Sequence, residues 1–203
     1  MKTNTPVTAL SRIVNAVHIA HAGIRHFLKV GEAVLLANDL LRQEAFYEAI
    51  AAHASFDMAD VAPDMVAEFM RETRIKMSVN MYYALNPKLT IDGYDDEHDP
   101  SAIHLNIWNV NRSPASICNT IIHACVHAVN VYNPQFSFGH GKGNAFTQQN
   151  TAPYWIGALA QRILAPEEPF VFMEHDPNPP AAKALFNDPG TVQAFSQSLW
   201  LTS

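Results

Sequence analysis

The chain has 203 residues, of which 48% are hydrophobic and 16% are charged, a composition typical of a globular protein with a substantial core. This length predicts one domain, or one domain with an appended segment. A formal net charge of -6 without a basic stripe excludes a nucleic-acid backbone as the expected partner. We expect neither a secretory signal peptide nor a membrane span, because the N-terminus lacks a continuous apolar core and no stretch reaches about 18 apolar residues. The cellular compartment stays open.

Residues 1–74 show the periodicity of helices. Apolar residues recur at steps of three and four from about residue 8 to 28 and again from about 32 to 54, and Gly31 is the expected break between these helices. Pro63 occupies a first-turn position and predicts the start of a third helix. We therefore predict an N-terminal helical segment over residues 1–74, which packs behind the rest of the chain or serves as a docking segment.

Residues 75–203 have a different pattern. Period-two alternation over 76–83 and 102–108, with a candidate strand over 89–94, predicts a small antiparallel or mixed sheet, so the expected fold class is α+β. The acidic stretch 95–100 lacks the spacing of a calcium loop and is interpreted as a solvated loop. The proline-rich region after Pro166 predicts an irregular segment that wraps onto the same unit.

A helix from Ser113 to about residue 132 carries the main chemical signal. Ser113 is a favourable N-cap, and Pro114 suits the first helical position. His123 and His127 are four residues apart, and this spacing stacks two imidazoles on one face of a helix. The pair alone is equally compatible with ordinary structural histidines, so a third potential ligand decides the interpretation.

That third imidazole belongs to His140, which stands between Gly139 and Gly141, where packing gives little reason for a histidine. Two imidazoles on a rigid helix and one on a loop are a suitable ligand set for tetrahedral zinc with one open position. We therefore predict Zn²⁺ on His123, His127 and His140. The reserve candidates for the third ligand are downstream carboxylates, namely Glu167, Glu168 and Glu174.

Three other residues of the predicted helix bear on the site. Asn130 follows His127 by three residues and is a candidate hydrogen-bond partner that orients an imidazole. Cys118 and Cys125 are seven residues apart, which on a helix places them about 10 Å apart along its axis. This separation is too large for a disulfide, so we interpret both as buried free thiols.

The run from His123 to His127 resembles the H-E-x-x-H helix of the zincin metallopeptidases, and the Gly-His-Gly around His140 resembles the third-ligand loop of SprT-like zincins. The second position of that motif is glutamate in the family and Ala124 here. In zincins the glutamate is the general base that takes a proton from zinc-bound water. The resemblance implies an intact metal site without its base. We favour a glutamate replaced in an inactivated protein over a natural pseudoenzyme.

The same resemblance implies roles for residues around the helix. In zincins the strand before the metal-binding helix is the edge of the sheet and pairs with an extended peptide substrate, so His104 and Trp108 are expected to line the cleft. Tyr154, on a helix expected after Thr151, is a candidate donor to the developing oxyanion. The alternative for Tyr154 is an aromatic residue of the core, and His104 could simply face solvent.

The expected function is therefore zinc-dependent hydrolysis of a peptide or protein substrate. Residues 76–164 also resemble, more weakly, metallopeptidase toxin domains of bacterial type VI secretion spike proteins, which implies delivery into a target cell and an immunity or delivery protein as partner. Two other classes compete with this interpretation. One is a non-catalytic zinc-binding pseudopeptidase or peptide-binding scaffold, and the other is an interaction protein whose helical half acts while its histidines are structural.

Overall fold

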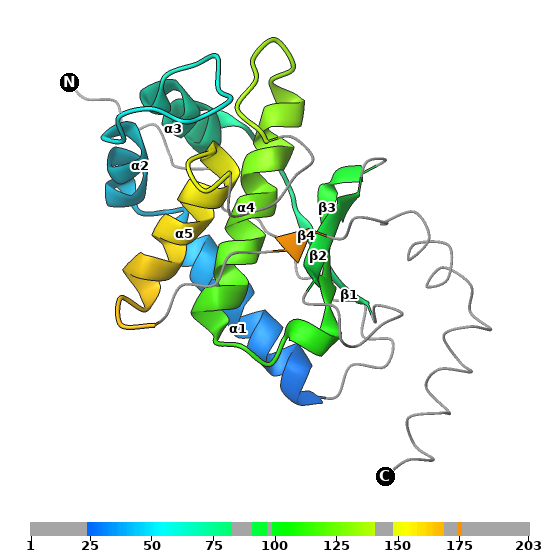
Figure 1. Cartoon of the computed structure of the whole chain (residues 1–203). Coiled ribbons are helices and arrows are strands. Elements are labelled where there is room, and N and C mark those ends of the chain that lie inside the picture. The colour runs from blue at the N-terminus through cyan, green and yellow to red at the C-terminus, as the bar shows by residue number, and fades with distance from the viewer. Residues whose placement is uncertain (1–23, 83–90, 97–98, 141–147, 169–173, 176–203) are drawn as a thin grey trace.

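The structure is a computed structural model and describes residues 24–82, 91–96, 99–140, 148–168 and 174–175 (Figure 1). The described elements follow one another as three helices, three strands, one short 3-10 helix, two helices and a short strand, so the fold class is α+β, as predicted. The predicted helix over residues 8–28 lies mostly outside the described residues, and so does the C-terminal proline-rich region.

The N-terminal part forms three helices, α1 (Ile24–Leu40), α2 (Glu44–Ala51) and α3 (Pro63–Glu72). The prediction of a break at Gly31 is wrong, because α1 continues through it. One face of α1 is fully buried through Val30, Val34 and Ala37, and this packing outweighs the cost of about 1 kcal/mol for a glycine in a helix interior. The predicted helix over 32–54 is instead divided by the turn between α1 and α2.

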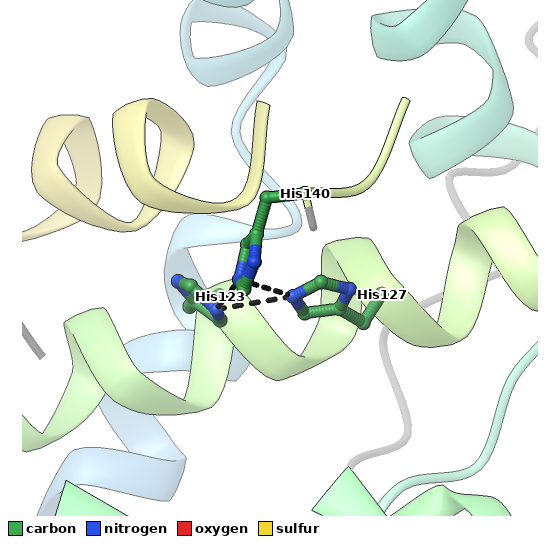
Figure 2. A group of neighbouring side chains, drawn as sticks. All are labelled: His123, His127 and His140. Atoms are coloured by element: carbon green, nitrogen blue, oxygen red, sulfur yellow. Dashed lines mark hydrogen bonds between the residues drawn. The ribbon is translucent and has the colours of Figure 1, made fainter. Parts of the chain in front are cut away.

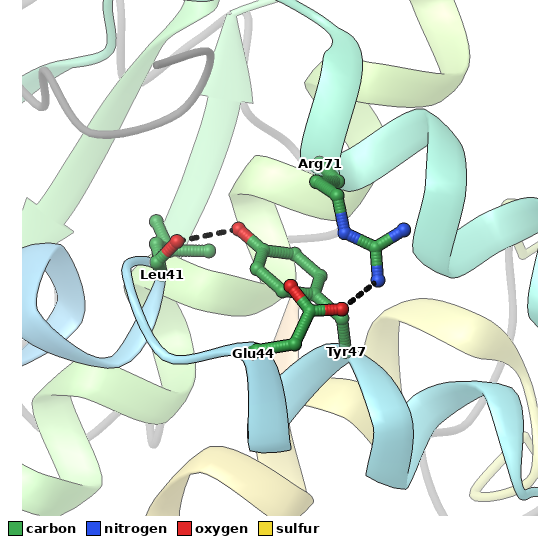
Figure 3. Close-up of polar contacts among 4 residues, drawn as sticks. All are labelled: Leu41, Glu44, Tyr47 and Arg71. Carbon is green, nitrogen blue, oxygen red and sulfur yellow. Dashed lines mark hydrogen bonds and ion pairs between the residues drawn. The ribbon is translucent and has the colours of Figure 1, made fainter. Parts of the chain in front are cut away.

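A polar cluster holds this turn against α3 (Figure 3). The Tyr47 hydroxyl donates a hydrogen bond to the Leu41 carbonyl oxygen at 2.6 Å. The Arg71 guanidinium lies 5.0 Å above the Tyr47 ring and donates to the Glu44 carboxylate at 2.6 Å. Burial raises the pKa of Tyr47 well above its ordinary value, although the nearby Arg71 charge acts in the opposite direction. The phenol therefore stays protonated and keeps its donor role.

The strands form a mixed sheet of order β1-β3-β2-β4, made of β1 (Ser78–Tyr82), β2 (Ile91–Asp96), β3 (Asp99–Asn106) and β4 (Glu174–His175). The pairs β1–β3 and β2–β4 are parallel, whereas β2–β3 is antiparallel, so the alternative of an antiparallel sheet is wrong. The prediction of a solvated loop over 95–100 is wrong at both ends, because β2 extends to Asp96 and β3 begins at Asp99, and these two residues pair with each other. Residues 97–98 lie outside the described part of the chain.

The position of β3 corrects one expectation about substrate binding. β3 is an inner strand, with His104 paired to Asn80 of β1 on one side and to Tyr94 of β2 on the other. Because both of its backbone edges are already hydrogen-bonded, β3 cannot add an extended peptide, and the prediction of an edge strand is wrong. Trp108 belongs to the short helix η1 (Ile107–Asn109), whose first turn is capped by the Asn106 side chain.

The central element is α4 (Pro114–Tyr132), which Figure 1 shows between the sheet and the other helices. Its start is as predicted, with the Ser113 hydroxyl accepting from the Ser116 N–H at 3.0 Å and Pro114 in the first turn. Most of α4 is buried, and one continuous hydrophobic core joins it to α1, α2, α3, the sheet and α5 (Ala152–Leu164). This core therefore extends across the predicted boundary at residue 74.

None of the described helices combines the length and the apolar character that a membrane crossing requires.

Candidate metal centre

Three imidazoles converge beside α4 (Figure 2). His123 and His127 project from adjacent turns of α4, and His140 comes from the loop that follows the helix. The Nε2 atoms of His123 and His127 are 3.1 Å apart, those of His123 and His140 are 3.1 Å apart, and those of His127 and His140 are 2.9 Å apart. His123 is buried, whereas His127 and His140 are half-buried, so the cluster has one side near the surface.

Hydrogen bonding among the rings does not account for this triangle. A neutral imidazole nitrogen is either a donor or an acceptor, so one Nε2–H can serve the other two nitrogens, but these two then face each other as acceptors. A shared cation satisfies all three nitrogens together. Ligand nitrogens of tetrahedral zinc, each about 2.0 to 2.1 Å from the ion, are separated by about 3.3 Å, close to the separations found here. The three histidines therefore fit a metal ion, whose identity their geometry leaves open.

Asn130 holds the loop that carries His140. Its side-chain amide donates to the Phe136 carbonyl at 2.8 Å, and its carbonyl oxygen accepts from the Phe138 N–H at 3.2 Å. Asn130 thus binds the backbone two and four residues before His140. The prediction placed Asn130 near the site but gave it an imidazole as partner, whereas these two bonds act on the loop.

Gly139 brings the loop close to α4. A Cβ at this position would lie 3.2 Å from the Asn130 Oδ1 and 3.7 Å from the His127 Nδ1. Its backbone does not have a positive φ, so the requirement for glycine is the space between loop and helix. Gly141, the other glycine beside His140, lies outside the described residues.

The N-terminal helices contact the same loop directly. The Phe69 ring of α3 stacks on Phe136 at 5.0 Å and on Phe138 at 5.9 Å between ring centroids. Between α2 and α3, the Asp60 carboxylate accepts from the Ser137 N–H at 2.8 Å, and the Ser137 carbonyl accepts from the Asp60 N–H at 2.9 Å. α3 and the segment before it therefore hold the loop that carries His140, a role that the helical periodicity did not reveal.

A second set of contacts fixes the chain after the loop. The Asn150 side chain donates to the Ser55 carbonyl at 3.1 Å and to the Asp57 carboxylate at 3.0 Å. Its carbonyl oxygen lies 2.9 Å from the His53 Nε2, and the His53 ring stacks on Trp155 of α5 at 4.1 Å. The segment from α2 to α3 thus anchors the chain on both sides of residues 141–147.

Tyr154, in the first turn of α5, lies against the imidazoles. Its ring stacks on His140 at 4.7 Å and meets the edge of His123 at 4.5 Å between centroids. The residue is 4% exposed, so it closes one side of the cluster as part of the core. The structure therefore brings Tyr154 to the predicted site, and its role as an oxyanion donor stays a prediction.

The close approach of α4 and α5 was not predicted. A Cβ on Gly157 would lie 2.9 Å from the Asn119 carbonyl oxygen and 3.3 Å from the His123 Cβ, so only glycine permits this spacing. Beside it, the buried Asn119 amide donates to the Gln161 side-chain oxygen at 3.0 Å. Asn119, His123 and His127 form a polar series at four-residue steps in a mostly apolar helix, and this series is the sequence signal that could have identified Asn119.

The two cysteines of α4 agree with the prediction made for them. Cys118 and Cys125 are buried free thiols, and burial raises the pKa of Cys118 above its ordinary value. Ala124 is 2% exposed and offers no proton acceptor. A divalent ion on these histidines would therefore have no general base at this position.

Other predicted site residues lie outside the ligand group. Within the described part of the chain, this group consists of the three histidines alone. His104 and Trp108 are half-buried in β3 and η1. Among the reserve carboxylates, Glu167 and Glu168 are exposed, Glu168 accepts a hydrogen bond from the Ser113 hydroxyl, and Glu174 belongs to β4.

Comparisons with known proteins were made by sequence and by structure. No family model, no curated protein and no solved structure matches this chain. The metal centre therefore has to be interpreted from its own geometry.

Proposed function

We propose that this chain is a zinc-dependent metallopeptidase of the zincin type whose general-base position is occupied by alanine. The observation that carries the proposal is the triangle of three Nε2 atoms, 2.9 to 3.1 Å apart, formed by two turns of one helix and a following loop. Bound zinc would polarise a peptide carbonyl and lower the pKa of a coordinated water toward about 7.

Other residues of the chain position the three ligands and border the place where a substrate would bind. His123 and His127 are fixed by α4, and His140 is fixed by the Asn130 hydrogen bonds and the Phe69 stack. Tyr154 lies against two of the imidazoles, within reach of a group bound there. Ala124 cannot accept a proton, and loss of a general base typically lowers a rate about 100- to 10,000-fold. The chain as it stands should therefore hydrolyse peptides only slightly.

The first test concerns the metal. Purified chain should contain one zinc ion, and His140→Ala should lose it while keeping its helical content, because His140 comes from a loop. A His26→Ala variant is the control, since His26 lies near the start of α1 and outside the ligand group. Unchanged zinc content in His140→Ala would remove the basis of the proposal.

The second test concerns the reaction. Ala124→Glu in the zinc-loaded protein should raise peptidase activity about 100- to 10,000-fold on a library of quenched peptides, whereas Ala124→Gln should leave it low, because the amide cannot take a proton. Zinc content is measured for both variants. Zinc-loaded Ala124→Glu without any gain on the library would favour the second candidate function, a zinc-binding pseudopeptidase or peptide-binding scaffold, which the alanine at position 124 also supports.

The weaker resemblance to type VI secretion toxin domains adds a proposal about context. In that case the substrate is a protein of a target cell, and an immunity or delivery protein binds this chain. Expression of Ala124→Glu in the periplasm or cytoplasm of a bacterial host, beside the unchanged chain, tests it through growth. Equal growth of the two strains would count against a toxin role.

A further inference from the structure

The part of the chain that builds the metal centre contains no carboxylate. Residues 101–165 include all three histidines, α4, the loop and α5, yet they have no Asp and no Glu. Their charged residues are Arg112, Lys142 and Arg162. All 19 acidic residues of the chain therefore lie outside the segment that surrounds the candidate metal.

Acidic residues on the neighbouring described elements do not fill this gap. Those of α1 and α3 are exposed, namely Glu32, Asp39, Asp64, Glu68 and Glu72. Asp60 reaches the loop but uses its carboxylate on the Ser137 N–H and is also exposed. The acids named here thus face solvent, and none of the described acids belongs to the ligand group.

A divalent ion held here would keep its full charge, because neutral imidazoles contribute none. His123 is 1% exposed and Ala124 is 2% exposed, and the surroundings of α4 are mostly apolar. An unbalanced charge is costly in such an environment unless an anion pairs with it. The open coordination position is where that anion can bind, and the half-buried His127 and His140 mark the side nearer the solvent.

We infer that the metal centre binds a carboxylate as its fourth ligand. The inference rests on the proposed metal site and names the class of ligand that the site takes. Hydroxide formed from a coordinated water, whose pKa zinc lowers toward about 7, is the competing anion, and it needs no base at position 124 because bulk solvent can take the proton. A carboxylate is already ionised at neutral pH and coordinates zinc through oxygen. Its source is either a small free acid or the C-terminal carboxylate of a peptide.

Two substitutions at position 124 test whether the bound ligand is negatively charged. A glutamate there would place a carboxylate on the residue next to His123 and would compete with or repel an incoming one. Ala124→Glu should therefore weaken carboxylate binding at least about tenfold, because like charges placed side by side are unfavourable. Glutamine at position 124 has nearly the same shape as glutamate but no charge, so Ala124→Gln should bind a carboxylate as tightly as the unchanged chain does.

The experiment uses the full chain loaded with Co²⁺, whose visible absorption changes when its ligands change. The probes are acetate, N-acetyl-dialanine with a free C-terminus, and the corresponding C-terminal amide. Acetate and the free acid should each change the spectrum up to a plateau that corresponds to one carboxylate bound per cobalt. The amide should leave the spectrum unchanged. Binding of the free acid at least about tenfold tighter than acetate would identify a peptide C-terminus as the source, and equal binding would identify small free acids.

Three results would overturn the inference. The first is an amide that binds as tightly as the free acid, because the ligand would then be neutral. The second is a stoichiometric cobalt protein whose spectrum no carboxylate changes, which would leave the metal site and the peptidase proposal standing. The third is a chain that binds neither cobalt nor zinc, which would end both proposals. Because the titration is made on the unchanged chain, it does not depend on the folding of any variant.

Discussion

Gly157 of α5 lies against His123 of α4, so that a Cβ on the glycine would be 3.3 Å from the His123 Cβ. The same Cβ would be 2.9 Å from the Asn119 carbonyl oxygen and would also meet the Asn119 side chain. One helix crossing therefore sets two things at once, the position of a histidine of the candidate metal centre and the buried hydrogen bond from Asn119 to Gln161.

Gly157→Ala should destabilise the fold by about 1–3 kcal/mol, the usual cost of overpacking a core. The added methyl group has to push α5 away from α4, and this movement displaces His123 and weakens zinc binding. Urea denaturation measures the first effect, and competition with a zinc chelator measures the second.

Gly31→Ala is the matched control for this prediction. Gly31 is also in a helix, but a Cβ there meets nothing within 4 Å. The same substitution should therefore stabilise the protein by about 0.5–1 kcal/mol, because alanine loses less backbone entropy in a helix. If both variants changed stability in the same direction, the steric explanation for Gly157 would be incorrect.

Asn130 should control metal affinity without touching the metal. Asn130→Ala removes both hydrogen bonds that hold the loop at Phe136 and Phe138, so His140 should become less well placed. We expect zinc affinity to fall about 10- to 100-fold, the usual effect of losing a group that orients a ligand. Isothermal titration or chelator competition gives the affinity directly.

The control for Asn130 is Asn133→Ala on the same helix end. The Asn133 side chain donates to the Val129 carbonyl at 2.8 Å and to the Thr73 hydroxyl at 3.0 Å, away from the loop segment that carries His140. It should lower stability by about 1 kcal/mol for lost hydrogen bonds but leave zinc affinity within about threefold. Equal losses of affinity in the two variants would mean that Asn130 acts only through general stability.

Local spacing was enough to predict part of the histidine cluster. His123 and His127 occur at a four-residue step inside a segment with a clear N-cap at Ser113, and a helix fixes the relation between such residues without any tertiary information. The contribution of His140 followed from composition, because its glycine neighbours indicated a loop. These features depend on near neighbours in the chain.

The predictions that were wrong concern contacts between residues far apart in the chain. The alternation in β3 shows which residues share a face, but strand order depends on the pairing of β3 with β1 and β2, which sequence periodicity does not encode. Likewise, the apolar face of α1 gave no sign that its burial would carry the helix through Gly31. The stacking of Phe69 on the loop that carries His140 was missed for the same reason, since a helical pattern indicates which face is buried but not which residues pack against it.

Alkaline pH should destabilise the protein through two buried groups. Burial raises the pKa of Tyr47 and of Cys118, so the native chain keeps protons that the unfolded chain releases above about pH 8.5 for the thiol and about pH 10 for the phenol. Their contribution to stability is complete below those values and is lost as the pH rises above them. Each group should lower the free energy of unfolding by about 1.4 kcal/mol per pH unit in that range.

Urea denaturation between pH 7 and pH 11 tests this expectation. Tyr47→Phe should cost about 1 kcal/mol at pH 7, because its hydrogen bond to the Leu41 carbonyl is lost. Above about pH 10 the same variant should lose stability less steeply than the unchanged chain. Parallel curves for the two proteins over the whole range would show that the Tyr47 proton does not contribute.

The last prediction separates support of the metal loop from support of the core. Phe69 and Met70 are neighbours on α3, but Phe69 stacks on the loop residues Phe136 and Phe138, whereas Met70 is fully buried in the hydrophobic core. Met70→Ala should cost about 2–5 kcal/mol and leave the zinc affinity of the folded protein unchanged. Phe69→Ala should cost less, because its side chain is half-buried, yet it should weaken zinc binding about tenfold, by the same loss of ligand placement expected at Asn130. Zinc affinity measured at low temperature, where both variants remain folded, distinguishes the two roles, and a larger loss of affinity in Met70→Ala would refute a special role for Phe69.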